Sequence, residues 1–266
     1  MADGRHDEST GTAPGHVSDR RDGILRVSQP AAEWLHTGWN GGRRVADAAY
    51  NITVPENWDC PDIRSYVVNR LERAGFDDEG PVLLTGVSMD HVRGARRQPV
   101  TVYATAGISN PAALPMHSTS EERTDSDRKR AACEPTESVT DPDDPPRPGT
   151  VNMLILVDRT LGDGALANLL AVAAEAKAAT LLARTGFPGT TTDAITVGHD
   201  PTERPIPYSG SATSVGSATR ACVREAVTAS LRSRYDEPDQ EIPESVHDAA
   251  HGIATDDRAD VFELPE

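Results

Sequence analysis

Long apolar runs and aromatic residues are both scarce in this sequence. Aromatic side chains make up 4% of the 266 residues, so a core must be built from Val, Leu, Ile and Ala. No apolar run approaches the roughly 18 residues that a membrane-spanning helix needs. The N-terminal residues 1–23 contain no apolar stretch of the kind found in secretory signals. We therefore expect a cytoplasmic protein that does not insert into a membrane.

Cysteine and lysine are also rare. Cys60, Cys133 and Cys222 are odd in number and far apart, which fits neither zinc-ligand spacing nor a disulfide scaffold. The sequence therefore predicts no metal site. Lys129 and Lys177 are the only lysines in a chain of net charge -16. This charge argues against a nucleic-acid partner, which needs a positive field, and such a lysine-poor acidic composition resembles proteins from a salt-rich cytoplasm.

Familiar nucleotide-binding and hydrolase motifs are missing as well. The chain has no Walker-type phosphate loop, no dinucleotide glycine pattern and no nucleophile-elbow pentapeptide. What it does have is a pattern of alternating strands and helices, which predicts an α/β or α+β fold: one domain whose mixed β-sheet is covered by helices. Strands are expected at 24–28, 45–55, 81–88, 99–109, 149–158 and 194–198, and helices at 61–74, 162–184 and 211–232.

Polar segments divide the chain around this domain. Residues 1–22 are predicted to be a disordered tail, and 23–235 to be the domain. A segment at about 117–148 is rich in Ser, Thr, Asp, Glu and Pro, cannot bury enough apolar surface to order itself, and is predicted to be a disordered insertion. Residues 236–266 are expected to be a frayed acidic tail. In contrast, the run at 149–158 is apolar on both faces, as is typical of a central strand.

Lys177 stands out in the helix expected at 162–184. A lysine on an apolar stripe must find an anionic partner, extend its ammonium group to solvent or lose its proton. Glu175 lies on nearly the opposite face, so the two side chains cannot pair within the helix. Lys177 is thus either a site residue or a lysine at the edge of the core. Its apolar neighbours, taken at about 100° per residue, are Leu166, Leu170, Ala173 and Leu181.

Hydroxyl groups gather just before the strand expected at 194–198. Gly189 to Asp193 reads GTTTD, and loops at strand ends often carry binding and catalytic groups. Consecutive hydroxyls suit recognition of an amide or a phosphate, and Asp193 can orient water or act as a base. Ordinary turn chemistry accounts for the same residues, because Thr and Asp satisfy local backbone groups well.

A basic loop and two threonines complete the candidates. His91 lies in the loop MDHVRGARRQ, where it is either a solvated histidine or a general acid or base near neutral pH. Thr85 and Thr105 lie near the ends of expected strands, and either is a possible nucleophile if a base lies beside it.

Several of these segments together resemble the adenosylcobinamide amidohydrolase family. They occur in the family's order and span about Ile24 to Leu231, and their order is more specific than any one of them. The segments are GWNGG (38–42), LLTGVSMDHVR (83–93), ATAGISNP (104–111), GTVNMLILVD (149–158), AAEAKAATLL (173–182) and PGTTTDAITV (188–197).

The resemblance implies an archaeal enzyme of corrinoid salvage. Such an enzyme hydrolyses the amide that joins the aminopropanol arm to the corrin ring substituent, giving adenosylcobyric acid and 1-amino-2-propanol. The corrinoid is the substrate, so no bound cofactor is implied. Two alternatives stay open: a corrinoid-binding protein without catalytic activity, and a different amide hydrolase with a threonine nucleophile.

For the reaction, we expect a site where the GTTTD loop, the Lys177 region and the strand of Asn152 converge. In this hypothesis Asp193 or Glu175 activates water, Lys177 or Asn152 stabilises the oxyanion and His91 assists, with a Thr192 nucleophile as the covalent alternative. The glycine pair at 41–42 and Trp34 or Trp39 are expected to line a corrin-binding face. The expected substrate-binding residues are Asn40, Gly41, Gly42, Thr85, Asn110, Asn152, Thr190 and Thr191.

Overall fold

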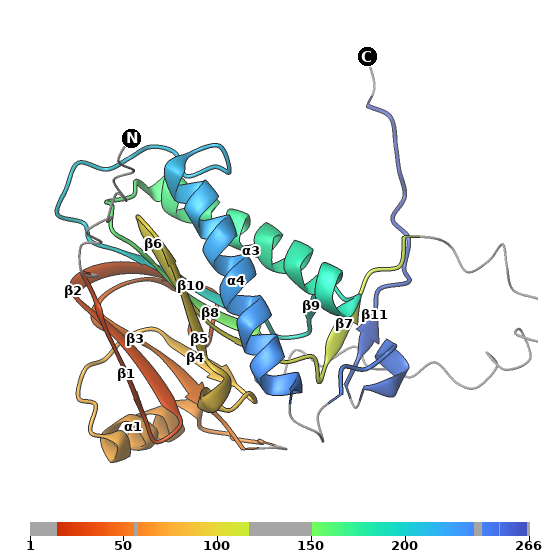
Figure 1. Ribbon diagram of the computed structural model, residues 1–266, viewed down its shortest axis with the longest axis horizontal. Helices are drawn as coiled ribbons and strands as arrows, with labels where there is room; N and C mark the ends of the chain where they lie inside the picture. The colour runs from red at the N-terminus through yellow and green to blue at the C-terminus, as the bar shows by residue number, and fades with distance from the viewer. Residues whose placement is uncertain (1–14, 56–57, 117–150, 237–240, 250, 265–266) are drawn as a thin grey trace, which may run out of the picture.

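The computed structural model describes residues 15–55, 58–116, 151–236, 241–249 and 251–264. They form a large eight-stranded sheet, a small three-stranded sheet and flanking helices (Figure 1). The large sheet contains β1 (Val17–Arg21), β2 (Ile24–His36), β3 (Gly42–Thr53), β4 (Val82–Thr85), β5 (Arg93–Arg97), β6 (Val100–Ala106), β8 (Val151–Val157) and β10 (Ala194–His199). The small sheet contains β7 (Pro111–Ala113), β9 (Gly189–Thr190) and β11 (Ile253–Ala254). The helices are α1 (Ile63–Ala74), α3 (Asp163–Thr185) and α4 (Ser214–Tyr235), with 3-10 turns η1 (Met89–His91) and η2 (Val246–Asp248).

The large sheet is mixed, which confirms the predicted fold class. Its strand order is β4-β3-β2-β10-β8-β6-β5, with β1 added beside β2. The β3–β4 and β8–β10 pairs are parallel, and the other neighbours are antiparallel. The predicted central strand is β8, whose seven residues are all buried between β10 and β6.

The sheet folds over on itself to enclose a core. Leu83 of β4 and Leu154 of β8 belong to one apolar cluster, together with Trp34 of β2. The outer face of β10, β8 and β6 packs against α3 and α4, and α1 packs on the outer face of β3 and β4. Figure 1 shows α1 and the α3–α4 pair on opposite sides of the strands. Alternate residues of the central strands therefore point either toward a helix layer or between the two halves of the sheet.

Local signals in the sequence explain the helix ends. The side chain of Asp62 accepts a hydrogen bond from Ser65 N (3.0 Å) at the start of α1, and Gly75 ends that helix in the left-handed conformation. Thr213 caps α4 in the same way through Gly216 N. By length and composition alone α3 is long and apolar enough to cross a membrane. Its buried residues pack against β8, β10 and α4, as in a core helix.

The structure corrects several expected boundaries. Val17–Arg21 lies within the predicted disordered tail but pairs along its whole length with β2. The strand expected at 24–28 continues to His36. The register between β2 and β3 shifts at a bulge between Ser28 and Ala32, and pairing resumes after it. Within the basic loop, Arg93–Arg97 forms β5. In the acidic tail, Ile253–Ala254 pairs with β7. The predicted insertion at about 117–148 lies outside the described residues.

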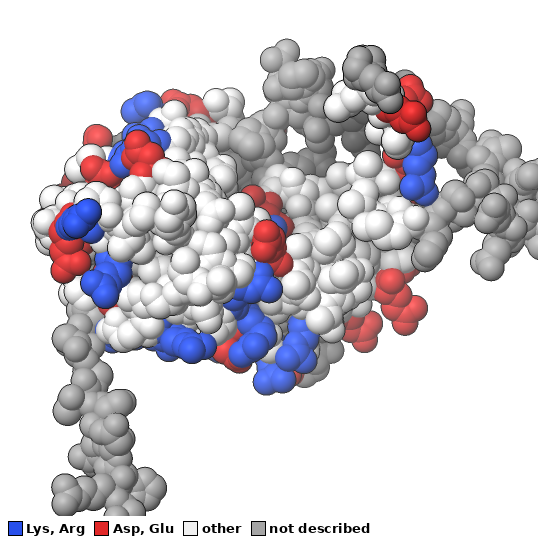
Figure 2. Space-filling view, turned by 90° about the horizontal axis from the view of Figure 1, so that it is seen from above, with Lys and Arg blue, Asp and Glu red and all other residues white. Residues whose placement is uncertain are grey.

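Charged side chains of both signs share the face of the molecule shown in Figure 2. Most of that face is uncharged, and basic and acidic groups lie close together in small clusters. Ion pairs between described residues include Arg43 with Glu33 and Asp163, and Arg26 with Asp78. Ion pairs at or near the surface contribute little to stability.

His36, at the end of β2, is a buried histidine with unsatisfied polar atoms. It is 3% exposed, and neither ring nitrogen has a hydrogen-bond partner. Burial, with a smaller contribution from the Arg44 charge, lowers the pKa of His36 to about 4. The imidazole is therefore neutral at pH 7 in the folded protein.

We predict that His36 makes stability fall as the pH drops from about 6.5 to about 4. Over this range the unfolded state binds a proton at His36 and the folded state does not, so protonation favours unfolding. The shift corresponds to a loss on the order of 3 kcal/mol. Denaturant unfolding at pH 7 and pH 4.5, at fixed salt, should show a smaller loss for His36→Leu than for the wild-type protein. Equal losses would show that His36 is not the group that titrates.

Candidate active site

A hydrogen-bonded network of amides and a hydroxyl lies between the two halves of the sheet. Asn152 Nδ2 donates to Asn51 Oδ1 (3.0 Å) and to the carbonyl oxygen of Leu84 (2.9 Å). Asn51 Nδ2 in turn donates to Thr105 Oγ1 (3.0 Å). The three side chains are at most 2% exposed. The network thus joins four strands, β3, β4, β6 and β8, that are far apart in the sequence.

Strand alternation places these side chains on the inner face. Thr105 and Asn152 are register partners on β6 and β8, and Asn152 is also the partner of Ala194 at the start of β10. The C-terminal ends of β3, β4 and β6 therefore meet the N-terminal ends of β8 and β10. Loops that leave these strand ends surround the network, which is the usual place for binding and catalytic groups.

The side-chain oxygen of Asn152 has no hydrogen-bond partner. Both hydrogens of its amide are donated inside the network, whereas its Oδ1 is buried and has no partner. Most buried polar atoms in proteins are hydrogen-bonded, so a free acceptor here is unusual. Asn152 is consequently available to accept a hydrogen bond, and its N–H groups are not free for the oxyanion role considered from the sequence.

Lys177 forms an ion pair with Asp193. Of the three possibilities for a lysine on an apolar stripe, the structure therefore shows the anionic partner. The ammonium group of Lys177 donates to Asp193 Oδ2, and the two side chains are 11% and 9% exposed. Asp193 also accepts hydrogen bonds from Thr190 N (3.1 Å) and from the Thr190 hydroxyl. The pair therefore fixes the GTTTD loop to α3 immediately before β10.

Asn110 holds the other side of this loop. Its Nδ2 donates to Thr191 Oγ1 (2.6 Å) and lies 3.5 Å from Thr192 Oγ1. Thr191 N donates to the carbonyl oxygen of Asn110 (3.1 Å), and β7 and β9 pair alongside. Asn110 is buried, whereas Thr191 and Thr192 are only partly buried. These two hydroxyl-bearing residues are the accessible part of the loop.

The remaining predicted residues lie elsewhere. Glu175 is on the exposed face of α3 and pairs with Arg220 of α4 (3.3 Å), so it does not join Lys177 and Asp193. His91 is buried in η1, where its Nδ1 lies 3.1 Å from Ser233 Oγ. Thr85 is buried and accepts from Val87 N (3.1 Å), beside the network. The exposed residues Asn40, Gly41 and Gly42 form the turn between β2 and β3.

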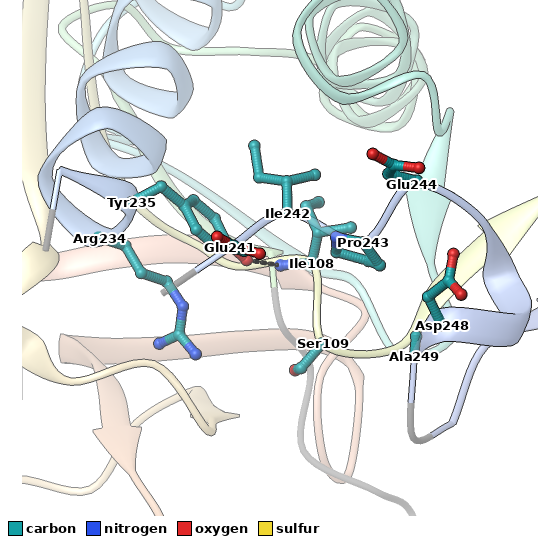
Figure 3. Close-up of a pocket in the computed structure, with 10 residues that line it drawn as sticks. All are labelled: Ile108, Ser109, Arg234, Tyr235, Glu241, Ile242, Pro243, Glu244, Asp248 and Ala249. Carbon is teal, nitrogen blue, oxygen red and sulfur yellow. Dashed lines mark hydrogen bonds between the residues drawn. The ribbon is translucent and has the colours of Figure 1, made fainter. Parts of the chain in front are cut away.

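A cavity of about 540 Å³ opens beside the C-terminal end of β6. Figure 3 shows its walls: the β6–β7 segment, the last turn of α4 and the chain around η2. Tyr235 is held there because its hydroxyl accepts a hydrogen bond from Ile108 N (2.7 Å). The cavity lining is Ile108, Ser109, Arg234, Tyr235, Glu241, Ile242, Pro243, Glu244, Asp248 and Ala249.

Sequence reasoning missed three members of this region. Asn51 lies within the strand expected at 45–55 and was not considered a candidate. Its polar side chain among Ala49, Tyr50 and Ile52 could have indicated a buried polar contact. Arg234 lies outside every segment of the resemblance, and Ser109 lies within ATAGISNP but was given no role there; only the folded chain brings the two residues to one cavity. Among the described residues, no group of three or more His, Cys, Asp and Glu side chains is placed to hold a metal ion.

Comparison with known proteins gives a consistent result. The family model described as adenosylcobinamide amidohydrolase matches residues 7–239. A protein of that name from Halobacterium salinarum is 55% identical over 243 residues, which cover 91% of this chain and 96% of the relative. Another of that name, from Methanosarcina mazei, is 27% identical over 212 residues, covering 76% of this chain and 91% of the relative.

Two solved structures show distant likenesses. A protein from Pyrococcus horikoshii OT3 aligns with 14% identity and a TM-score of 0.34, covering 82% of this chain and 79% of that one. A Burkholderia beta-aminopeptidase aligns with 12% identity and a TM-score of 0.32, covering 80% and 79%. Similarity at this level establishes neither a common fold nor a common activity.

Proposed function

This chain belongs to the adenosylcobinamide amidohydrolase family, and we propose that it hydrolyses the amide joining the aminopropanol arm to the corrin ring substituent of adenosylcobinamide. The products are adenosylcobyric acid and 1-amino-2-propanol, and the reaction returns an incomplete corrinoid to coenzyme synthesis. The observation that carries the proposal is the 55% identity to the halobacterial amidohydrolase over nearly the whole of both chains.

Amide hydrolysis sets three chemical demands. An oxygen nucleophile attacks the carbonyl carbon, the carbonyl oxygen takes up negative charge, and the nitrogen receives a proton as the C–N bond breaks. With water as the source of the added oxygen and hydrogen atoms, the products are a carboxylate and an ammonium ion at neutral pH. The site must therefore hold an amide, tolerate a developing anion and release an amine.

We assign the reaction to the strand ends around Asn152 and the GTTTD loop. Thr191 and Thr192 contact the substrate, because they are partly exposed. The buried Asn110, which follows the cavity residue Ser109, holds them in place. Asn152 and Asn51 are positioning residues that lock the strand ends together from within. A corrinoid is far larger than the cavity of about 540 Å³, so only the amide arm enters and the corrin ring stays outside.

Lys177 and Asp193 are positioning residues in this proposal. Asp193 already accepts hydrogen bonds from Lys177 and from two groups of Thr190, which leaves it poorly placed to take a proton from water. The nucleophile is then either water or the hydroxyl of Thr192. Intact-protein mass spectrometry of quenched reactions separates these routes, because only a threonine nucleophile leaves a corrinoid acyl group on the chain.

We further propose that the enzyme works in a salt-rich archaeal cytoplasm. The acidic, lysine-poor composition and the halobacterial relative both support this setting. Activity assays therefore belong in molar potassium chloride.

The experiment is product analysis by mass spectrometry. The purified full-length chain is incubated with adenosylcobinamide in molar potassium chloride, and we expect adenosylcobyric acid and aminopropanol in equal amounts. Tight binding with the ligand left intact would identify a corrinoid carrier instead. A folded protein that neither binds nor cleaves adenosylcobinamide would contradict the proposed substrate.

A further inference from the structure

Arg234 crosses from the last turn of α4 to the strand ends of the candidate site. A Cβ atom added to Gly107, just after β6, would lie 3.0 Å from Arg234 Nε and 3.1 Å from Val87 Cγ2. The arginine stem therefore lies directly over the backbone that leaves β6, next to the segment that follows β4. Gly107 allows this close approach because it has no side chain.

The guanidinium group of Arg234 has no anionic partner among the described residues. Its Nε is buried and makes no hydrogen bond, and no described carboxylate pairs with the side chain. Its guanidinium carbon lies 5.8 Å from the centre of the Tyr235 ring. Arg234 combines this buried, unpartnered Nε with a place in the cavity lining, and a buried cationic donor without an acceptor is costly.

The position of Arg234 in the cavity indicates where its missing partner belongs. In Figure 3 Arg234 and Ser109 lie away from Glu244 and Asp248, and Glu241 is drawn nearer, beside Tyr235, without an ion pair to Arg234. Ser109 is followed by Asn110, which holds the GTTTD loop. An acceptor that reaches Arg234 therefore lies between the cavity and the strand ends where the amide is expected.

We propose that Arg234 binds the oxygen that becomes anionic during hydrolysis, and then the carboxylate of the corrinoid product. This inference rests on the proposed function. The substrate amide is neutral, whereas its former carbonyl oxygen carries charge after attack and keeps it in the carboxylate. A guanidinium group binds a carboxylate through charge-assisted, bidentate hydrogen bonds, so it favours the charged states over the neutral amide.

The test compares the affinity for the product with the affinity for the substrate. Replacing the guanidinium in Arg234→Met should raise the inhibition constant of adenosylcobyric acid about 10- to 100-fold and lower kcat by a similar factor. The KM for adenosylcobinamide should change less than about 3-fold, because the neutral amide gains little from the cation. Arg234→Lys should retain part of both effects, since it keeps the charge and loses the planar fork.

Arg232 provides the matched control. It lies in the same last turn of α4 and is exposed outside the cavity, so Arg232→Met should leave the product inhibition constant and kcat unchanged. Equal increases in KM and in the product inhibition constant for Arg234→Met would mean a merely structural role and would overturn the inference. Should Arg234→Met not fold, Arg234→Gln carries the same comparison.

The two proposals fail separately. If the wild-type protein forms adenosylcobyric acid but Arg234→Met binds this acid as tightly as wild type, the inference is wrong and the function stands. If the wild-type protein forms no product, the function is wrong, and direct titration with adenosylcobyric acid then decides whether Arg234 binds its carboxylate.

Discussion

Replacing Asp193 with alanine should lower the free energy of unfolding by about 3–5 kcal/mol and remove nearly all amide hydrolysis. The substitution leaves the Lys177 ammonium group buried without a partner, and a buried cation alone is strongly destabilising. It also removes both acceptors that hold Thr190. The GTTTD loop would then lose its anchor to α3. Denaturant unfolding and the rate of adenosylcobyric acid formation measure the two effects.

A double variant separates the buried charge from the loop anchor. Asp193→Leu with Lys177→Met removes both charges, so its stability should recover most of the loss while its activity stays low. Glu225→Gln is the matched control, because Glu225 pairs with Arg224 on the exposed surface of α4. That change should cost less than about 1 kcal/mol. An Asp193→Ala protein as stable and as active as this control would contradict the positioning role.

Replacing Asn152 with alanine is expected to slow hydrolysis at least about 100-fold and to cost about 2–4 kcal/mol of stability. The change leaves two buried acceptors, Asn51 Oδ1 and the carbonyl oxygen of Leu84, without their donors. It also frees the ends of β3 and β4 from the end of β8. Both acceptors lie in the core, where water cannot replace the lost donors.

Two variants define what Asn152 supplies. Asn152→Asp keeps the shape but places a carboxylate against two acceptor oxygens, so we expect it to be at least as damaging as alanine. Asn168→Ala is the control: Asn168 donates to Ser209 (3.2 Å) from an exposed position on α3, and its loss should cost no more than about 1.5 kcal/mol. Full activity in Asn152→Ala would place the chemistry away from the strand ends.

The elements with strong periodicity were predictable. The two-faced apolar run at 149–158 gave the central strand β8, and the long apolar helix appears as α3 within a residue or two of its expected ends. The sequence also predicted that Lys177 has an anionic partner, reaches solvent or loses its proton, because it lies on an apolar stripe of the helix. Its partner Asp193 came from a loop that was chosen independently for its hydroxyl groups.

The meeting of Asn51, Thr105 and Asn152 was not predictable. Their hydrogen bonds span 54 and 101 residues of sequence and exist because the sheet folds over on itself. Strand periodicity fixes which face a side chain takes, but not which distant strand lies opposite. The bulge in β2 was also not predictable from local sequence. Ala31 lies in it with a positive φ of 53°, where the register between β2 and β3 shifts.

Glu175 shows where composition misleads and helical spacing does not. Its carboxylate made it a natural candidate base beside Lys177, yet two positions along a helix turn it to the opposite face, where it pairs with Arg220. Arg234 is the converse case. Nothing in its local sequence indicates a function. The inference for Arg234 comes from its close approach to Gly107 and from its buried Nε, which has no hydrogen-bond partner.

The most direct test of the central claim is hydrolysis in water enriched in oxygen-18. Adenosylcobinamide is incubated with wild-type protein and with Asn152→Ala in molar potassium chloride, and the adenosylcobyric acid formed is analysed by mass spectrometry. The account predicts one oxygen-18 atom in the new carboxylate of the wild-type product and almost no product from the variant. Unlabelled substrate recovered intact from the wild-type reaction, or labelled product formed equally fast by Asn152→Ala, would contradict it.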